Sequence, residues 1–132
     1  MKLLIPLVLV AAVVLISGCT SGTANDNSNT TPGVKEFQVT IGHTAYSPSS
    51  FTVTRGDTVR FMAVAAPGTE SHNHGITIDE YNINQAVTSS ATPTKIEFVA
   101  DKAGTFQIYC KTCRDGPFGT GHPDIRATLV VQ

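Results

Sequence analysis

The sequence predicts an all-β domain, a two-sheet β-sandwich with Greek-key connections. Three observations predict it: apolar residues alternate with polar ones in short runs, turn residues separate the runs, and no run has the period of an amphipathic helix of three turns. Alternation places every second side chain on the same face of a strand, so each run has one face to bury. About six or seven short strands in a chain of this size are typical of a sandwich.

The alternating residues define the strands in order along the chain. They are Phe37, Val39 and Ile41; Phe51 and Val53; Val59 and Phe61; Ile76 and Ile78; Ile96 and Phe98; Phe106 and Ile108; and a last strand over residues 127–131. Turn residues stand between them at Ser47-Pro48-Ser49, Arg55-Gly56-Asp57, Ala66-Pro67-Gly68 and Asp101-Lys102-Ala103-Gly104. We expect Asp57 to shape its hairpin rather than to bind a ligand.

Residues 1–19 read as an export signal. The apolar run from Leu3 to Ile16 is shorter than the about 20 residues of a membrane-spanning helix, but it suits the core of a signal peptide. The sequence Ile16-Ser17-Gly18-Cys19 resembles a lipobox, in which the cysteine receives lipid. An uncleaved anchor and an ordinary cleavage site are the alternatives. In each case we expect the folded part to lie on the extracytoplasmic face, held at the membrane.

Residues 20–33 contain no large apolar side chain, so we expect a flexible linker, followed by one folded domain over residues 34–132. Charge is nearly balanced, with 9 Lys and Arg against 10 Asp and Glu. The basic residues are spread singly, which argues against a nucleic-acid partner. The sequence also lacks a Ser-His-Asp set, a phosphate loop and paired carboxylates, so we expect neither an enzyme in its own right nor a small-molecule substrate.

Four residues are candidate metal ligands: Cys110 and Cys113 at the end of one predicted strand, His122 before the next, and His74 before the strand at Ile76. Thiolate and imidazole are soft and borderline ligands, which suit copper or zinc. A sandwich that brings the ends of the two hairpins together would place all four at one site.

The residues that carry these features resemble the cupredoxin family. Residues 46–53 and the hairpin at 55–61 are similar to its opening strands, and the C-terminal part resembles the copper A domain of cytochrome oxidase subunit II and nitrous oxide reductase. In that domain a histidine and a short apolar strand precede a Cys-x3-Cys-x3-His-x2-Met loop. His74 matches the first histidine, and Cys110, Cys113 and His122 match the loop in order.

The resemblance implies a cupredoxin-like fold, copper as cofactor, and electron transfer with a redox protein or a terminal oxidase as partner. The sequence departs from the copper A loop in three respects. Only two residues separate Cys110 from Cys113, eight separate Cys113 from His122, and Ile125 stands where the methionine is expected. The resemblance therefore implies a centre with one or two copper ions, since a single ion with two imidazoles and one thiolate also suits the residues.

Several alternatives stay open at this point. The Cys-x2-Cys pair could form a disulfide or a thiol-exchange pair, or it could store and deliver copper(I), and zinc suits the same four ligands. His72 could replace His74 as the ligand. We expect His43, a lone histidine, to be an ordinary surface or structural residue, and Glu70 to be a solvated loop carboxylate.

Overall fold

The computed structural model describes residues 31–114 and 124–132. The expected signal at 1–19, residues 20–30 of the expected linker, and His122 lie outside the described residues. The strands are β1 (Val34–Ile41), β2 (Tyr46–Ser47), β3 (Ser50–Val53), β4 (Thr58–Ala65), β5 (Gly75–Ile78), β6 (Ile83–Ala86), β7 (Thr94–Val99), β8 (Gly104–Tyr109) and β9 (Arg126–Val131). Two 3-10 turns, η1 (Asp79–Tyr81) and η2 (Thr112–Arg114), follow β5 and β8.

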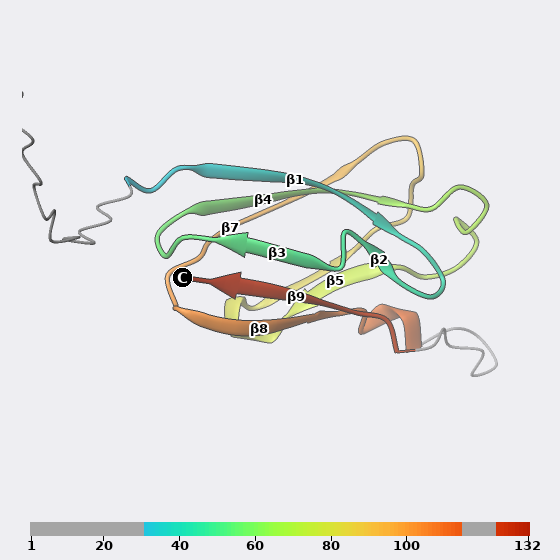
Figure 1. The fold of residues 1–132 in the computed structure, drawn as a ribbon. Coiled ribbons are helices and arrows are strands. Elements are labelled where there is room, and N and C mark those ends of the chain that lie inside the picture. Colours follow the sequence, from blue (N-terminus) through green and yellow to red (C-terminus); the bar gives the residue numbers. More distant parts are fainter. Residues whose placement is uncertain (1–30, 115–123) are drawn as a thin grey trace, which may run out of the picture.

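The strands form two packed sheets, seen as two layers in Figure 1. One sheet has the order β2-β1-β4-β7 and the other the order β3-β9-β8-β5-β6. Pairs β1–β4 and β3–β9 are parallel, while the remaining pairs are antiparallel. Several strands that are adjacent in a sheet are far apart in the sequence, so the chain must cross between the two sheets, as it does in Greek-key connections. The predicted all-β sandwich is confirmed.

The core lies between the sheets and is built from the alternating residues. In β4 every second side chain is buried, because that strand has one face toward the other sheet. Its buried members are Val59, Phe61, Ala63 and Ala65. The rings of Phe37, Phe51 and Phe61 meet at the centre, with centroids 5.2 Å apart for the first two and 4.8 Å apart for the last two.

Two short strands, β2 and β6, were not expected, and β5 departs from alternation. All four residues of β5 are buried, including Thr77. The Thr77 hydroxyl donates to the side-chain oxygen of Asn84 on β6 and accepts from the backbone N–H of Lys111 after β8, at 3.1 and 3.4 Å. A polar side chain can therefore be buried on the second face of β5.

Asp57 joins the start of the domain to the turn after β3. Its buried carboxylate accepts hydrogen bonds from the backbone N–H groups of Gly33 and Thr54, at 2.9 and 2.8 Å. The bond to Thr54 holds the turn between β3 and β4, as expected for Asp57, but these two strands lie in different sheets, so the turn is not the expected hairpin. The bond to Gly33 fixes the chain immediately before β1.

No helix among residues 31–114 and 124–132 has the length and hydropathy needed to span a bilayer.

Candidate metal centre

His74 and the two cysteines lie at the same end of the sandwich. His74 immediately precedes β5 and Cys110 immediately follows β8, and these strands are antiparallel neighbours with Thr77 opposite Tyr109. Antiparallel pairing places the start of one strand beside the end of the other. Figure 1 shows the connections β1–β2 and β4–β5 and the turn η2 at this end, on the right of the view. The strand pairing therefore places these three residues at one end of the sandwich, and their convergence on a single metal stays a prediction.

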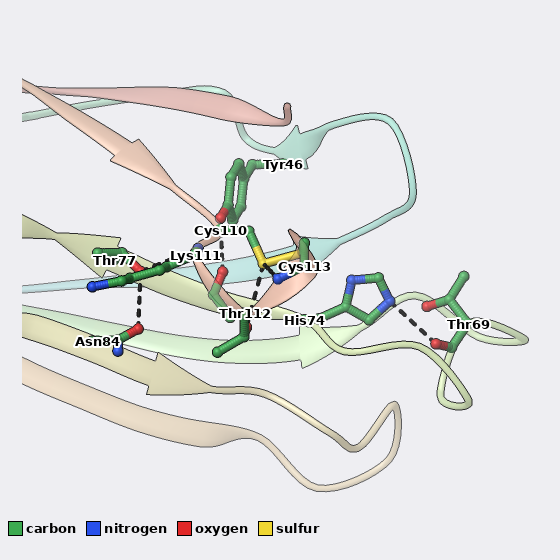
Figure 2. Close-up of a disulfide and its surroundings, with 10 residues drawn as sticks. Tyr46, Thr69, His74, Thr77, Asn84, Cys110, Lys111, Thr112 and Cys113 are labelled. Atoms are coloured by element: carbon green, nitrogen blue, oxygen red, sulfur yellow. Dashed lines mark hydrogen bonds between the residues drawn. A yellow bond between two sulfur atoms is a disulfide. The ribbon is translucent and has the colours of Figure 1, made fainter. Parts of the chain in front are cut away.

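Close packing at Gly75 brings the His74 segment against the cysteine loop. A Cβ atom on Gly75 would lie 2.7 Å from Oγ1 of Thr112, which stands between the cysteines, and 2.8 Å from the Gln85 carbonyl oxygen. From the other side, the buried Tyr46 hydroxyl of β2 donates to the Gly75 carbonyl oxygen at 2.7 Å (Figure 2). Three elements therefore fix the backbone next to His74.

The His74 imidazole is buried and held in one orientation. Its Nε2 lies 3.1 Å from the Thr69 carbonyl oxygen, and Figure 2 shows Nε2 turned toward Thr69 and away from the cysteines. A carbonyl can only accept, so Nε2 carries the proton. Burial lowers the pKa of His74, and the ring is therefore neutral near pH 7. In this tautomer the lone pair lies on Nδ1, which is the arrangement a metal-binding imidazole needs.

Cys110 and Cys113 are joined by a disulfide and are both buried. The backbone N–H of Cys113 donates to Sγ of Cys110 at 3.1 Å, and the Thr112 hydroxyl lies 3.5 Å from the same sulfur. The alternative of a disulfide therefore describes the two cysteines in this structure. Their role as metal ligands concerns the reduced pair, because only a thiolate binds a metal in this way, and it stays a prediction.

The fourth predicted ligand, His122, lies outside the described residues. Within residues 31–114 and 124–132, no three His, Cys, Asp or Glu side chains are placed to hold a metal ion. The donor set is nevertheless suited to copper once the disulfide is reduced, because one oriented imidazole and two sulfurs lie at one end of the sandwich. Ile125 is buried in the core, so the expected methionine position contributes packing and no ligand.

The other candidates occupy different environments. His72 is exposed, in contrast to the buried His74. A hydrogen bond from the Ser90 side chain lowers the pKa of the exposed Glu70 carboxyl, which fits the expected loop carboxylate. His43 differs from the expectation of a lone residue, because its ring centroid lies 4.4 Å from that of His72 and 5.8 Å from that of His74. Sequence spacing gave no signal for this cluster, since the two loops meet only through the fold.

Comparison with known proteins agrees with this architecture. Residues 7–131 match the cupredoxin-like domain. Nitrous-oxide reductase from Cupriavidus necator is 34% identical over 73 residues, which cover 55% of this chain and 11% of that protein. The chain thus spans only about a tenth of the length of this relative.

Solved structures share the fold at low sequence identity. A heme-copper terminal oxidase dimer matches with a TM-score of 0.56 and 14% identity, over 92% of this chain and 78% of that one. Copper nitrite reductase from Nitrosomonas europaea matches with a TM-score of 0.54 and 14% identity, over 75% of this chain and 41% of that one. A mixed disulfide between a thioredoxin-like protein and subunit II of cytochrome c oxidase matches with a TM-score of 0.54 and 10% identity, over 74% of this chain and 80% of that one. Because the family match extends over nearly the whole sequence and the two-sheet fold agrees with it, this chain belongs to the cupredoxin-like family.

Proposed function

We propose that this protein is an extracytoplasmic copper-binding electron carrier in which His74, Cys110, Cys113 and His122 hold the metal. The observation that carries the proposal is the buried His74 imidazole, whose Nδ1 has the lone pair, on the segment packed against the Cys-x2-Cys loop. Copper, when bound, supplies one-electron redox chemistry. The protein's part is to hold the ligands in one geometry through oxidation and reduction, which a two-sheet scaffold suits.

The centre is a copper A-like pair or a single copper ion, and the residues present bear on this choice. Ile125 is an apolar core residue, so a thioether ligand at this position is absent in either case. Two thiolates in one loop favour two ions that share them. One thiolate with the imidazoles of His74 and His122 would suit a single ion.

Copper binding at the sulfurs requires that the disulfide first be reduced by two electrons. An extracytoplasmic dithiol protein is a suitable reductant, since thiol–disulfide exchange proceeds through a mixed disulfide. We infer a redox protein or a terminal oxidase as the partner in electron transfer. The solved complex of a thioredoxin-like protein with an oxidase subunit II, which contains a similar fold, supports both partners. A signal at 1–19 and a linker at 20–33 would leave the domain at 34–132 near the membrane.

The test is copper loading of the reduced full chain, followed by absorption and electron paramagnetic resonance spectra. We expect intense thiolate-to-copper(II) absorption and a reversible redox wave, and the hyperfine pattern distinguishes one copper nucleus from two coupled nuclei. Cys113→Ser should change both colour and copper content if both thiolates bind. Cys19→Ser is the matched control, because Cys19 is outside the predicted ligand set.

Two results would contradict the proposal. A colourless protein that binds only copper(I) and releases it to a competing ligand would indicate storage or delivery of copper. A protein that retains zinc and excludes copper would indicate a zinc site.

A further inference from the structure

Three imidazole rings form a series from the surface to the interior at the proposed copper end. His72 is exposed, His43 is partly exposed and His74 is fully buried. The ring of His43 is in contact with both of the others, with centroids 4.4 Å from His72 and 5.8 Å from His74. His43 comes from the loop after β1, whereas the other two come from the loop before β5.

The spacing of His43 and His72 suits two ligands of one ion. Two imidazole nitrogens, each about 2.1 Å from an ion and at roughly a right angle to one another, hold their ring centroids about 4.6 Å apart. The observed separation is 4.4 Å, and the ring planes are inclined by 70°. Imidazole suits copper and zinc, and water molecules would complete the coordination of an ion at the protein surface.

We propose that His72 and His43 form a capture pair, which binds a copper(II) ion at the surface and passes it to His74. The proposal rests on the proposed copper function of His74. A pair of protein ligands holds an ion less firmly than four, and this favours transfer to the complete centre. Each transfer step is an exchange of imidazole and water ligands at copper. No electron is transferred and no covalent bond of the chain is broken.

The His72–Asn73–His74 segment is suited to this transfer. The backbone N–H of His72 donates to the Thr69 carbonyl oxygen at 3.0 Å, and the same oxygen accepts from Nε2 of His74. One carbonyl therefore positions both the outer and the inner histidine. His43, which contacts both rings, bridges the exposed and the buried ends of the series.

The first test uses the full chain with the Cys110–Cys113 disulfide closed, so that these sulfurs cannot act as thiolates. Copper(II) is titrated in the presence of a competing amino-acid chelator, with Cys19→Ser as the background to remove the third thiol. We expect His72→Ala and His43→Ala each to weaken binding at least tenfold. The matched control is Asn73→Ala, an exposed neighbour in the same loop, which should bind as the background protein does.

The second test measures transfer. After reduction, copper(II) is mixed with each variant and the growth of thiolate-to-copper absorption is followed by stopped flow. We expect both histidine variants to load several-fold more slowly and to reach the same final spectrum. Unchanged binding in the titration, or an unchanged loading rate, would overturn the capture pair. Failure of the proposed function gives a different result: the reduced background protein then develops no thiolate-to-copper absorption. The titration of the oxidised protein does not depend on that absorption, so it still tests the capture pair.

Discussion

The tight packing around Gly75 leads to a prediction that runs against the usual preference for alanine. Glycine inside a strand is ordinarily less favourable than alanine by about 0.5–1 kcal/mol, because the unfolded chain loses more freedom. At Gly75 an added Cβ would lie 2.7 Å from Thr112 Oγ1 and 2.8 Å from the Gln85 carbonyl oxygen. Both distances are too short for real contacts, so either the cysteine loop or the pairing of β5 with β6 must shift.

The size of the effect follows from these two contributions. Overpacking a closely packed site costs about 1–3 kcal/mol, and the alanine preference offsets only part of it. We therefore expect Gly75→Ala to lower the free energy of unfolding by about 1 kcal/mol or more, with a melting temperature lower by about 4–8 °C per kcal/mol. The Gln85 oxygen belongs to the backbone of the paired strand, so a side-chain rotation cannot relieve that contact.

The assay is denaturant unfolding followed by circular dichroism, since the chain contains no Trp. Gly33→Ala is the matched control, because a Cβ at Gly33 meets nothing within 4 Å. That variant should be as stable as the natural protein or slightly more stable. Thr112→Ala in the Gly75→Ala background should restore part of the loss, by removing one of the two contacts. Gly75→Ala with the stability of Gly33→Ala would refute the packing argument.

Two further predictions concern buried polar groups. Tyr46→Phe should lower the free energy of unfolding by about 1–2 kcal/mol, because the Gly75 carbonyl oxygen loses a buried donor. Equal denaturation midpoints for the variant and the natural protein would contradict this prediction. Hydrogen bonds from the backbone of Gly33 and Thr54 hold the pKa of Asp57 below its ordinary value of 3.8. The stabilising contribution of Asp57 is therefore present above that value and is lost as pH falls through the folded-state pKa. Melting temperatures measured down to about pH 3 should fall less steeply for Asp57→Asn than for the natural protein. Parallel melting-temperature curves for the two proteins would exclude this source of acid sensitivity.

Most of the fold could be predicted because burial on one face leaves a period of two in the sequence. The strands centred on Val39, Phe61 and Leu129 were found in this way, since their inward residues are apolar and regular. The same logic could not find β2 or β6. Strand β2 is only Tyr46 and Ser47, and β6 exposes three of its four residues, so neither leaves an alternating apolar pattern.

The position of His74 and the cysteines at the same end of the sandwich was predictable, because it follows from antiparallel pairing of the strands that flank them. The bonding state of the sulfurs was not, because Cys-x2-Cys spacing is compatible with both a disulfide and a pair of thiolate ligands. The chemistry of the site thus depends on a redox equilibrium that the residue order leaves undetermined. Reduction converts a buried cross-link into two potential ligands beside an imidazole whose lone pair is already oriented.

The position of His43 shows why a residue can be misjudged when only its own segment is considered. On the sequence it stands alone, 29 positions before His72, and a lone histidine is most often an ordinary surface residue. In the fold, β1 ends at Ile41 and the parallel partner β4 ends at Ala65, with these two residues directly opposite. The loops that leave the two strands must therefore start side by side, and both carry histidines. The parallel β1–β4 pairing, rather than any local motif, makes a histidine series possible at this end of the sandwich.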